Sequence, residues 1–208
     1  MIRAKGQTLS SFAVALAEAG AVHFGKFTLS SGKASSYYID LRRVPSFPRV
    51  YKEVVQAYKF MARKVGMSYF DVIAGIATSG LTFSSPLAIS VSKPMVYVRQ
   101  EKSYGTRKRL EGALPKGSTA LVLDDLVTTG GNIIDAVKSL RAEGAKVRDA
   151  VVLVDRLEGG KENLKRRGVR LHSFSTILEL SEALHEGGMI TEAQLASVKD
   201  QVRGTDRL

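Results

Sequence analysis

Two adjacent carboxylates, followed by a turn rich in hydroxyls and glycines, are the most informative chemical feature of the 208-residue sequence. The segment reads Leu123-Asp124-Asp125-Leu126-Val127-Thr128-Thr129-Gly130-Gly131-Asn132. Between a strand and a helix, such a turn offers free backbone N–H groups and the positive end of a helix dipole to a phosphate. Carboxylates beside it repel a bare phosphate but accept hydrogen bonds from hydroxyls. The expected ligand therefore carries a vicinal diol close to its phosphate, as ribose 5-phosphate does.

Two familiar phosphate-binding motifs are absent from this turn. A Walker loop needs a lysine after its glycines and a dinucleotide-binding turn needs G-x-G-x-x-G, whereas here Gly130 and Gly131 are followed by Asn132. A plainer interpretation stays open, in which Asp124 and Asp125 only cap the following helix. The run of threonines and glycines favours a bound sugar phosphate over that interpretation.

A second turn between a strand and a helix has a similar character. The apolar stretch Asp71–Ala77 leads into Thr78, Ser79 and Gly80, and the apolar helical pattern of Leu81–Ile89 follows. Hydroxyls and backbone N–H groups at the start of a helix suit an anion. Taken alone, the turn is also explained as a tight connection without a ligand. Together with the acidic turn, it predicts a second phosphate site.

A polar and strongly basic stretch lies at Arg99–Gly112 and has almost no apolar residues to bury. This composition predicts a surface loop or flexible ribbon. Such a loop can close on an anionic site, exclude water and supply cations to a departing group. A solvated run of charge without a ligand is the alternative interpretation.

Two further places suit a planar ligand. Tyr37 and Tyr38 are paired aromatics that can stack on a planar ring, although packing in the core also explains them. Arg156 follows a predicted strand, where its guanidinium can grip a carboxylate through two hydrogen bonds. A surface salt bridge from Arg156 to Asp155 or Glu158 is the alternative.

Apolar runs that alternate with helical patterns indicate a parallel sheet covered by helices on both faces, which is an α/β fold. The predicted strands are Asp71–Ala77, Met95–Arg99, Thr119–Leu123, Arg148–Val154 and Val169–Phe174. Helices are predicted at Leu9–Ala19, from Pro48 to Gly66, after the acidic turn as far as Gly144, and after a capping box at Thr191–Gln194. The stretch Phe24–Arg43 is predicted to be irregular and to fold over the edge of the sheet.

The composition places the chain among globular proteins and excludes several kinds of site. Hydrophobic residues make up 44% and charged residues 25%, as is ordinary for soluble proteins, and we expect a cytoplasmic location and no membrane association. The absence of cysteine excludes disulfides, thiolate metal sites and cysteine nucleophiles. The net charge of +11 is compatible with nucleic acid or with an anionic small substrate. Because the charge is scattered, we favour the small substrate and do not expect nucleic-acid binding.

The acidic turn resembles the PRPP-binding motif of the type I phosphoribosyltransferases. Resemblance implies their fold in one domain, with an N-terminal hood at about residues 1–45 and a core at about 46–208. It also implies that Asp124 and Asp125 bind the ribose hydroxyls of PRPP and that Thr78–Gly80 holds its pyrophosphate. By the same resemblance, the 5-phosphate is bound by the turn formed by Leu126, Val127, Thr128, Thr129, Gly130, Gly131 and Asn132.

Three other segments resemble the orotate phosphoribosyltransferases within that family. They are the hood segment Phe27–Arg42, the basic stretch, and the run Asp155-Arg156-Leu157-Glu158-Gly159-Gly160. The resemblance implies orotate binding by Tyr37, Tyr38, Thr128 and Arg156. It implies PRPP contacts from Arg99, Lys102 and Tyr104, and catalysis by Arg99 and Lys102 together with the two aspartates. Ser30, Gln100 and Tyr104 depart from the family's usual residues, and the loop is one residue short before Lys102.

The implied reaction transfers the 5-phosphoribosyl group of PRPP to orotate, giving orotidine 5′-monophosphate and pyrophosphate in UMP biosynthesis. Mg²⁺ is the expected cofactor, held mainly by PRPP and without dedicated protein ligands. A homodimer is expected, in which subunits share the loop Arg99–Gly112. Two alternatives remain: a phosphoribosyltransferase for another base, and a PRPP-responsive regulator that binds nucleic acid.

Overall fold

The computed structural model describes residues 2–4, 7–28, 32, 34–99 and 109–205. Its elements in chain order are β1 (Ile2–Ala4), β2 (Gln7–Thr8), α1 (Leu9–Glu18), β3 (Val22–Thr28), β4 (Ala34–Ile39), a 3-10 helix (Leu41–Ser46), α2 (Pro48–Val65), β5 (Val72–Ile76), α3 (Ser79–Val91), β6 (Met95–Val98), β7 (Leu110–Glu111), β8 (Thr119–Leu123), β9 (Leu126–Val127), α4 (Gly131–Ala142), β10 (Lys146–Asp155), α5 (Gly160–Arg166), β11 (Arg170–Thr176), α6 (Ile177–Glu186) and α7 (Glu192–Thr205). No helix in these ranges is long and apolar enough to cross a membrane.

The five predicted strands and the short strand β7 form one central sheet in the order β11-β10-β8-β5-β6-β7, and the short strand β9 also pairs with β10. Every pairing in it is parallel except that of β6 with β7, which is antiparallel. The predicted α/β fold is confirmed, and the five predicted strands agree with β5, β6, β8, β10 and β11 to within a few residues. β7 lies in the basic stretch, so one end of that predicted loop is in fact a short strand.

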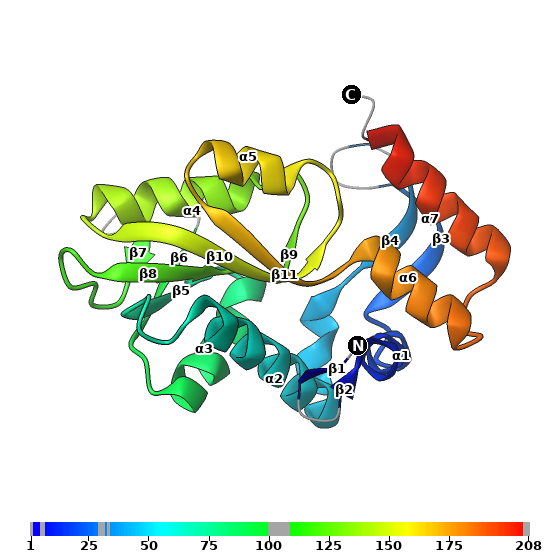
Figure 1. Ribbon diagram of the computed structural model, residues 1–208, viewed down its shortest axis with the longest axis horizontal. Helices are drawn as coiled ribbons and strands as arrows, with labels where there is room; N and C mark the ends of the chain where they lie inside the picture. The colour runs from blue at the N-terminus through cyan, green and yellow to red at the C-terminus, as the bar shows by residue number, and fades with distance from the viewer. Residues whose placement is uncertain (1, 5–6, 29–31, 33, 100–108, 206–208) are drawn as a thin grey trace.

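The central strands are apolar on both sides because helices cover both faces of the sheet (Figure 1). One face packs against α1, α2, α3 and α6, and its buried strand residues include Ile73, Leu121, Leu123, Val151 and Leu153. The other face packs against α4 and α5 through Val72, Ala74, Val122, Ala150 and Val152. This alternation fixes the register of the sheet, and therefore which residues follow each strand at its carboxyl end.

The stretch that we predicted to be irregular is largely an antiparallel hairpin of β3 and β4, followed by the 3-10 helix. The prediction was wrong because Gly, Ser and Tyr obscured a two-residue period, which the burial of Ser35, Tyr37 and Ile39 reveals. The hairpin lies at one end of the sheet, beside α1, α6 and α7 (Figure 1). In the predicted capping box at the start of α7, the Thr191 hydroxyl accepts a hydrogen bond from the Gln194 backbone at 3.2 Å.

Candidate active site

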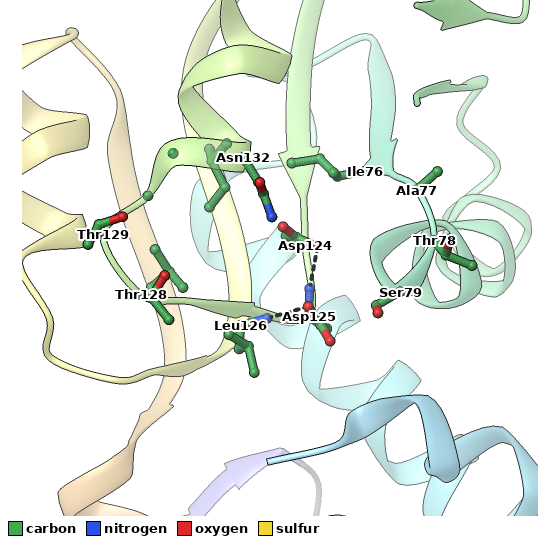
Figure 2. Close-up of a pocket in the computed structure, with 14 residues that line it drawn as sticks. Ile76, Ala77, Thr78, Ser79, Asp124, Asp125, Leu126, Thr128, Thr129 and Asn132 are labelled. Carbon is green, nitrogen blue, oxygen red and sulfur yellow. Dashed lines mark hydrogen bonds between the residues drawn. The ribbon is translucent and has the colours of Figure 1, made fainter. Parts of the chain in front are cut away.

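A cavity of about 270 Å³ opens at the carboxyl ends of β5 and β8, where ligands bind in open α/β sheets. It is lined by residues 76–79 from the β5–α3 turn and by residues 124–133, which run from the end of β8 into α4. Figure 2 shows Thr78 and Ser79 on one side and Thr128, Thr129 and Asn132 on the other, with the aspartates between them. The sheet thus brings together the two turns that the sequence predicted to hold phosphates.

Asp124 and Asp125 both line this cavity and are hydrogen-bonded to the backbone. Oδ1 of Asp124 accepts a hydrogen bond from the Asp125 N–H at 3.0 Å, and Oδ1 of Asp125 accepts one from the Leu126 N–H at 2.9 Å. The hydroxyl of Tyr58, on α2, donates to the Asp124 carbonyl oxygen at 2.9 Å and ties this strand end to the core.

Burial raises the pKa of Asp124 well above its ordinary value, and the charge of Asp125 raises it further. Burial also raises the pKa of Asp125, although backbone and side-chain hydrogen bonds, including one from Ser79, partly offset this effect. Within the described part of the chain, no cationic side chain pairs with either carboxylate. The pair is therefore short of positive charge and of hydrogen-bond donors, and a polyhydroxyl or cationic ligand supplies both.

Two helices begin at the cavity wall. α3 begins at Ser79 and α4 at Gly131, after Gly130 in a left-handed conformation with φ of 85°. Thr78, the residue before α3, makes no capping hydrogen bond with its side chain, and Gly130, the residue before α4, has no side chain with which to make one. The first N–H groups of both helices are thus available to anions, and the two helix dipoles favour negative charge at their starts.

Gly80 was predicted to contact PRPP, but it does not line the cavity. A Cβ at this position would lie 2.5 Å from the Leu123 carbonyl oxygen and 3.1 Å from Cα of Asp124. The glycine therefore lets α3 start directly against the end of β8. This close contact fixes the position of the first turn of α3 against β8. Gly80 therefore helps to position the two sides of the cavity relative to each other.

Arg156 lies just after β10 and is almost completely buried, with 6% of its surface exposed. Its Nε donates to the Tyr37 hydroxyl at 3.3 Å and lies 2.9 Å from Oε1 of Glu158. Tyr37 has no exposed surface, so the structure gives its ring a place in the core beneath Arg156, where the sequence predicted stacking on a base. Tyr38 is partly exposed, and its hydroxyl accepts a hydrogen bond from Arg42 at 3.1 Å.

Residues at and after Arg156 also hold in place the turn at Val127–Thr129, which lines the cavity. The Arg156 N–H donates to the Val127 carbonyl at 3.0 Å, and the Asn163 side chain on α5 donates to the Thr129 carbonyl at 2.8 Å. A Cβ on Gly160 would lie 2.5 Å from the Thr128 carbonyl oxygen. Asn163 was not predicted from the sequence, because it belongs to no motif and reaches the turn only through its contact with Thr129 in the folded structure.

Arg99 follows β6 and does not line the cavity. Its Nε and Nη2 both donate to Oε1 of Glu111, at 2.9 and 2.6 Å, and its backbone N–H donates to the Arg109 carbonyl at 2.9 Å. These contacts join the two ends of the basic stretch. Lys102 and Tyr104 lie outside the described residues, as do the departures at Ser30 and Gln100.

The described residues contain no cluster of three or more histidine, aspartate or glutamate side chains that would hold a metal ion by themselves. The oxygen atoms of Asp124 and Asp125 nevertheless suit a hard cation such as Mg²⁺, whose remaining ligands come from water or phosphate. His23 and His172 contact the Gly20 carbonyl and Asp149, and His185 pairs with Glu192, so all three have structural partners.

Comparisons with known proteins relate most of the chain to one family. The family model for the phosphoribosyl transferase domain matches residues 49–174. Orotate phosphoribosyltransferase from Cenarchaeum symbiosum is 41% identical over 197 residues, which cover 94% of this chain and 98% of that protein. The crystal structure of orotate phosphoribosyltransferase from Aeropyrum pernix has a TM-score of 0.75 at 39% identity, covering 86% of this chain and 99% of that one. The structure of Leishmania donovani UMP synthase has a TM-score of 0.85 at 34% identity, covering 95% of this chain and 43% of that chain.

Proposed function

The chain belongs to the orotate phosphoribosyltransferase family, and on this premise we propose how its residues carry out the family's reaction. That reaction transfers the 5-phosphoribosyl group from PRPP to orotate and gives orotidine 5′-monophosphate and pyrophosphate in UMP biosynthesis. The observation that carries the proposal is the position of two helix N-termini on either side of one pair of adjacent carboxylates, inside one cavity.

PRPP occupies this cavity with its two charged ends at the two helices. Thr128–Asn132 and the start of α4 bind the 5-phosphate, whereas Thr78, Ser79 and the start of α3 bind the pyrophosphate. Asp124 and Asp125 accept hydrogen bonds from the ribose hydroxyls. Support comes from the raised pKa values of both carboxyls, because hydroxyl donors stabilise the ionised pair that burial destabilises.

Catalysis in this site is a matter of position and electrostatics. As the bond from the ribose C1 to pyrophosphate loosens, positive charge grows on the ribose ring and negative charge on the leaving group. Asp124 and Asp125 hold the ribose so that orotate approaches C1 from the opposite face, while Arg99 and Lys102 neutralise the pyrophosphate. Preorganised groups of this kind need no general base.

Mg²⁺ would be held mainly by the phosphates of PRPP, and the carboxylates of Asp124 and Asp125 are the protein groups whose chemistry suits it. When bound, the ion supplies positive charge to the departing pyrophosphate. The orotate carboxylate is gripped by Arg156, and Thr128 and Tyr38 complete the base site.

The protein acts as a homodimer in the cytoplasm, and its subunits share the loop Arg99–Gly112. Helix α3 supports the dimer, because it contains no charged residue and keeps 82% of Ile89 exposed. A helix of this kind is normally covered on its outer face as well. A second copy of the chain is the partner that we propose for it.

The substrate assignment is tested by following the loss of orotate absorbance with PRPP and Mg²⁺, in parallel with uracil, hypoxanthine and adenine. We expect turnover with orotate only. Efficient turnover of a purine would point to a transferase for another base. No turnover with any base, together with salt-sensitive binding of RNA or DNA, would instead support a regulatory protein.

A further inference from the structure

The guanidinium of Arg156 is held from one side. Its Nε donates to the Tyr37 hydroxyl at 3.3 Å and lies 2.9 Å from Oε1 of Glu158. Nη2, which lies beside Nε on the same edge of the guanidinium, is buried and has no hydrogen-bond partner within the described part of the chain. A buried donor without a partner is unfavourable. Nη2 is therefore suited to donate to an acceptor on a ligand.

Tyr37 is fixed in place around this contact. Its side chain is completely buried, and Cζ of Arg156 lies 4.8 Å from the centre of its ring. The Ser35 hydroxyl donates to the Tyr37 carbonyl at 2.7 Å, and the Ser36 N–H donates to the Gln201 side chain of α7 at 2.7 Å. The strand that carries Tyr37 is thereby attached to the C-terminal helix, so the hydroxyl is a rigid acceptor.

We propose that Tyr37 is a positioning residue for orotate, which it does not touch. A guanidinium can grip a carboxylate through its two Nη atoms or through Nε and Nη2. Because Tyr37 and Glu158 occupy Nε, only the edge formed by the Nη atoms remains for the carboxylate of orotate. Tyr37 thus selects the edge that Arg156 presents, and with it the orientation of the base. This inference rests on the proposed contact between Arg156 and orotate.

Tyr37→Phe tests this role, since it keeps the ring beneath Arg156 and removes only the hydroxyl. The measurements are the KM for orotate, the KM for PRPP, and the inhibition constant of uracil as a competitor of orotate. Loss of a hydrogen bond to a charged group should raise the orotate KM about tenfold. The other two constants should stay unchanged, because neither PRPP nor uracil carries the carboxylate that Arg156 grips.

Tyr51→Phe is the matched control, because it also removes a single tyrosine hydroxyl, which donates to the Thr82 carbonyl at 2.6 Å and does not contact Arg156. It should leave all three constants unchanged, even if it lowers the melting temperature. An unchanged orotate KM in Tyr37→Phe would overturn the positioning role, and so would a parallel rise of all three constants. Arg156→Ala tests the contact between Arg156 and orotate separately from the role of Tyr37. If this variant leaves the orotate KM unchanged, the proposed contact itself is wrong.

Discussion

Asp124 is a residue whose charge acts against the stability of the free protein. Burial and the neighbouring Asp125 raise its pKa well above the ordinary value of 3.8, so the folded protein binds more protons than the unfolded chain between that value and the raised pKa. The free energy of unfolding therefore falls as the pH rises through this window. Asp124→Asn should remove this loss, and the variant should be more stable than the wild type at neutral pH without substrate.

Urea unfolding of both proteins from pH 3.5 to 8 measures this difference. The advantage of Asp124→Asn should grow as the pH rises above the ordinary value of 3.8 and should vanish below it. An advantage of the same size at every pH would contradict the raised pKa, because it would then come from packing and not from charge.

Lys102 is the residue for which the proposed role depends most on electrostatics. Its removal by Lys102→Ala should lower kcat by about a hundredfold or more, because preorganised charge at a leaving group contributes on that scale. The fold should be intact by circular dichroism. Lys116→Ala is the matched control, since Lys116 is exposed in the turn before β8, at the opposite end of that strand from the cavity. Similar kcat values for the two variants would refute the role of Lys102.

The residues that line the cavity were predicted from the sequence more successfully than the side chains that contact them. Thr78, Ser79 and Asp124 lie together in the cavity as their motifs predicted, since strand ends in a parallel sheet meet at one edge. Packing of Tyr37 in the core was one of the two interpretations that the sequence left open, but its contact with Arg156 and the bond from Asn163 to Thr129 were not predictable. Each joins segments that lie far apart in the sequence, and no local pattern encodes such a pair.

The start of α3 is the element that sets the width of the cavity, through the contact of Gly80 with the end of β8. Gly80→Ala places a methyl group 2.5 Å from the Leu123 carbonyl oxygen, so the helix must shift. Overpacking of this kind costs about 1–3 kcal/mol, and the KM for PRPP should rise with it. Thermal unfolding and initial-rate kinetics measure the two effects.

Gly204→Ala provides the comparison for Gly80→Ala. Gly204 lies in α7, and a Cβ there meets no atom within 4 Å. This variant should unfold at the same or a slightly higher temperature, because alanine favours the helix, and its kinetics should match the wild type. If Gly80→Ala behaves like Gly204→Ala, the close contact does not determine the geometry of the site.

Most of the elements with long or strongly apolar patterns followed from the sequence, although α6 was not predicted. Thr119–Leu123 was predicted with its observed bounds because a strand buried on both faces is a continuous apolar run. The hairpin of β3 and β4 was missed, because its strands expose polar residues and contain Gly25, Ser35 and Ser36. β7 was also missed, since two residues paired to β6 leave no periodic signal.

For the whole molecule, the exposed side of α3 predicts how two copies assemble. Ile89→Lys replaces the exposed apolar residue of α3 by a charge and should convert the dimer into a monomer, because desolvation of an unpaired lysine opposes association. Light scattering after size-exclusion chromatography measures the mass. The monomer should lose activity, and mixing it with Lys102→Ala protein should not restore it. A wild-type monomer with full activity would refute the shared loop.

The proposed function depends first of all on the binding of PRPP in the cavity around Asp124 and Asp125. Titration calorimetry with PRPP and Mg²⁺, on the wild type and on Asp125→Asn, tests it most directly, because this change removes a charge and keeps the shape. The wild type should bind PRPP, and the variant should bind it about ten- to a hundredfold more weakly, as expected when hydrogen bonds to a charged group are weakened. Equal affinities in the two proteins would contradict the account.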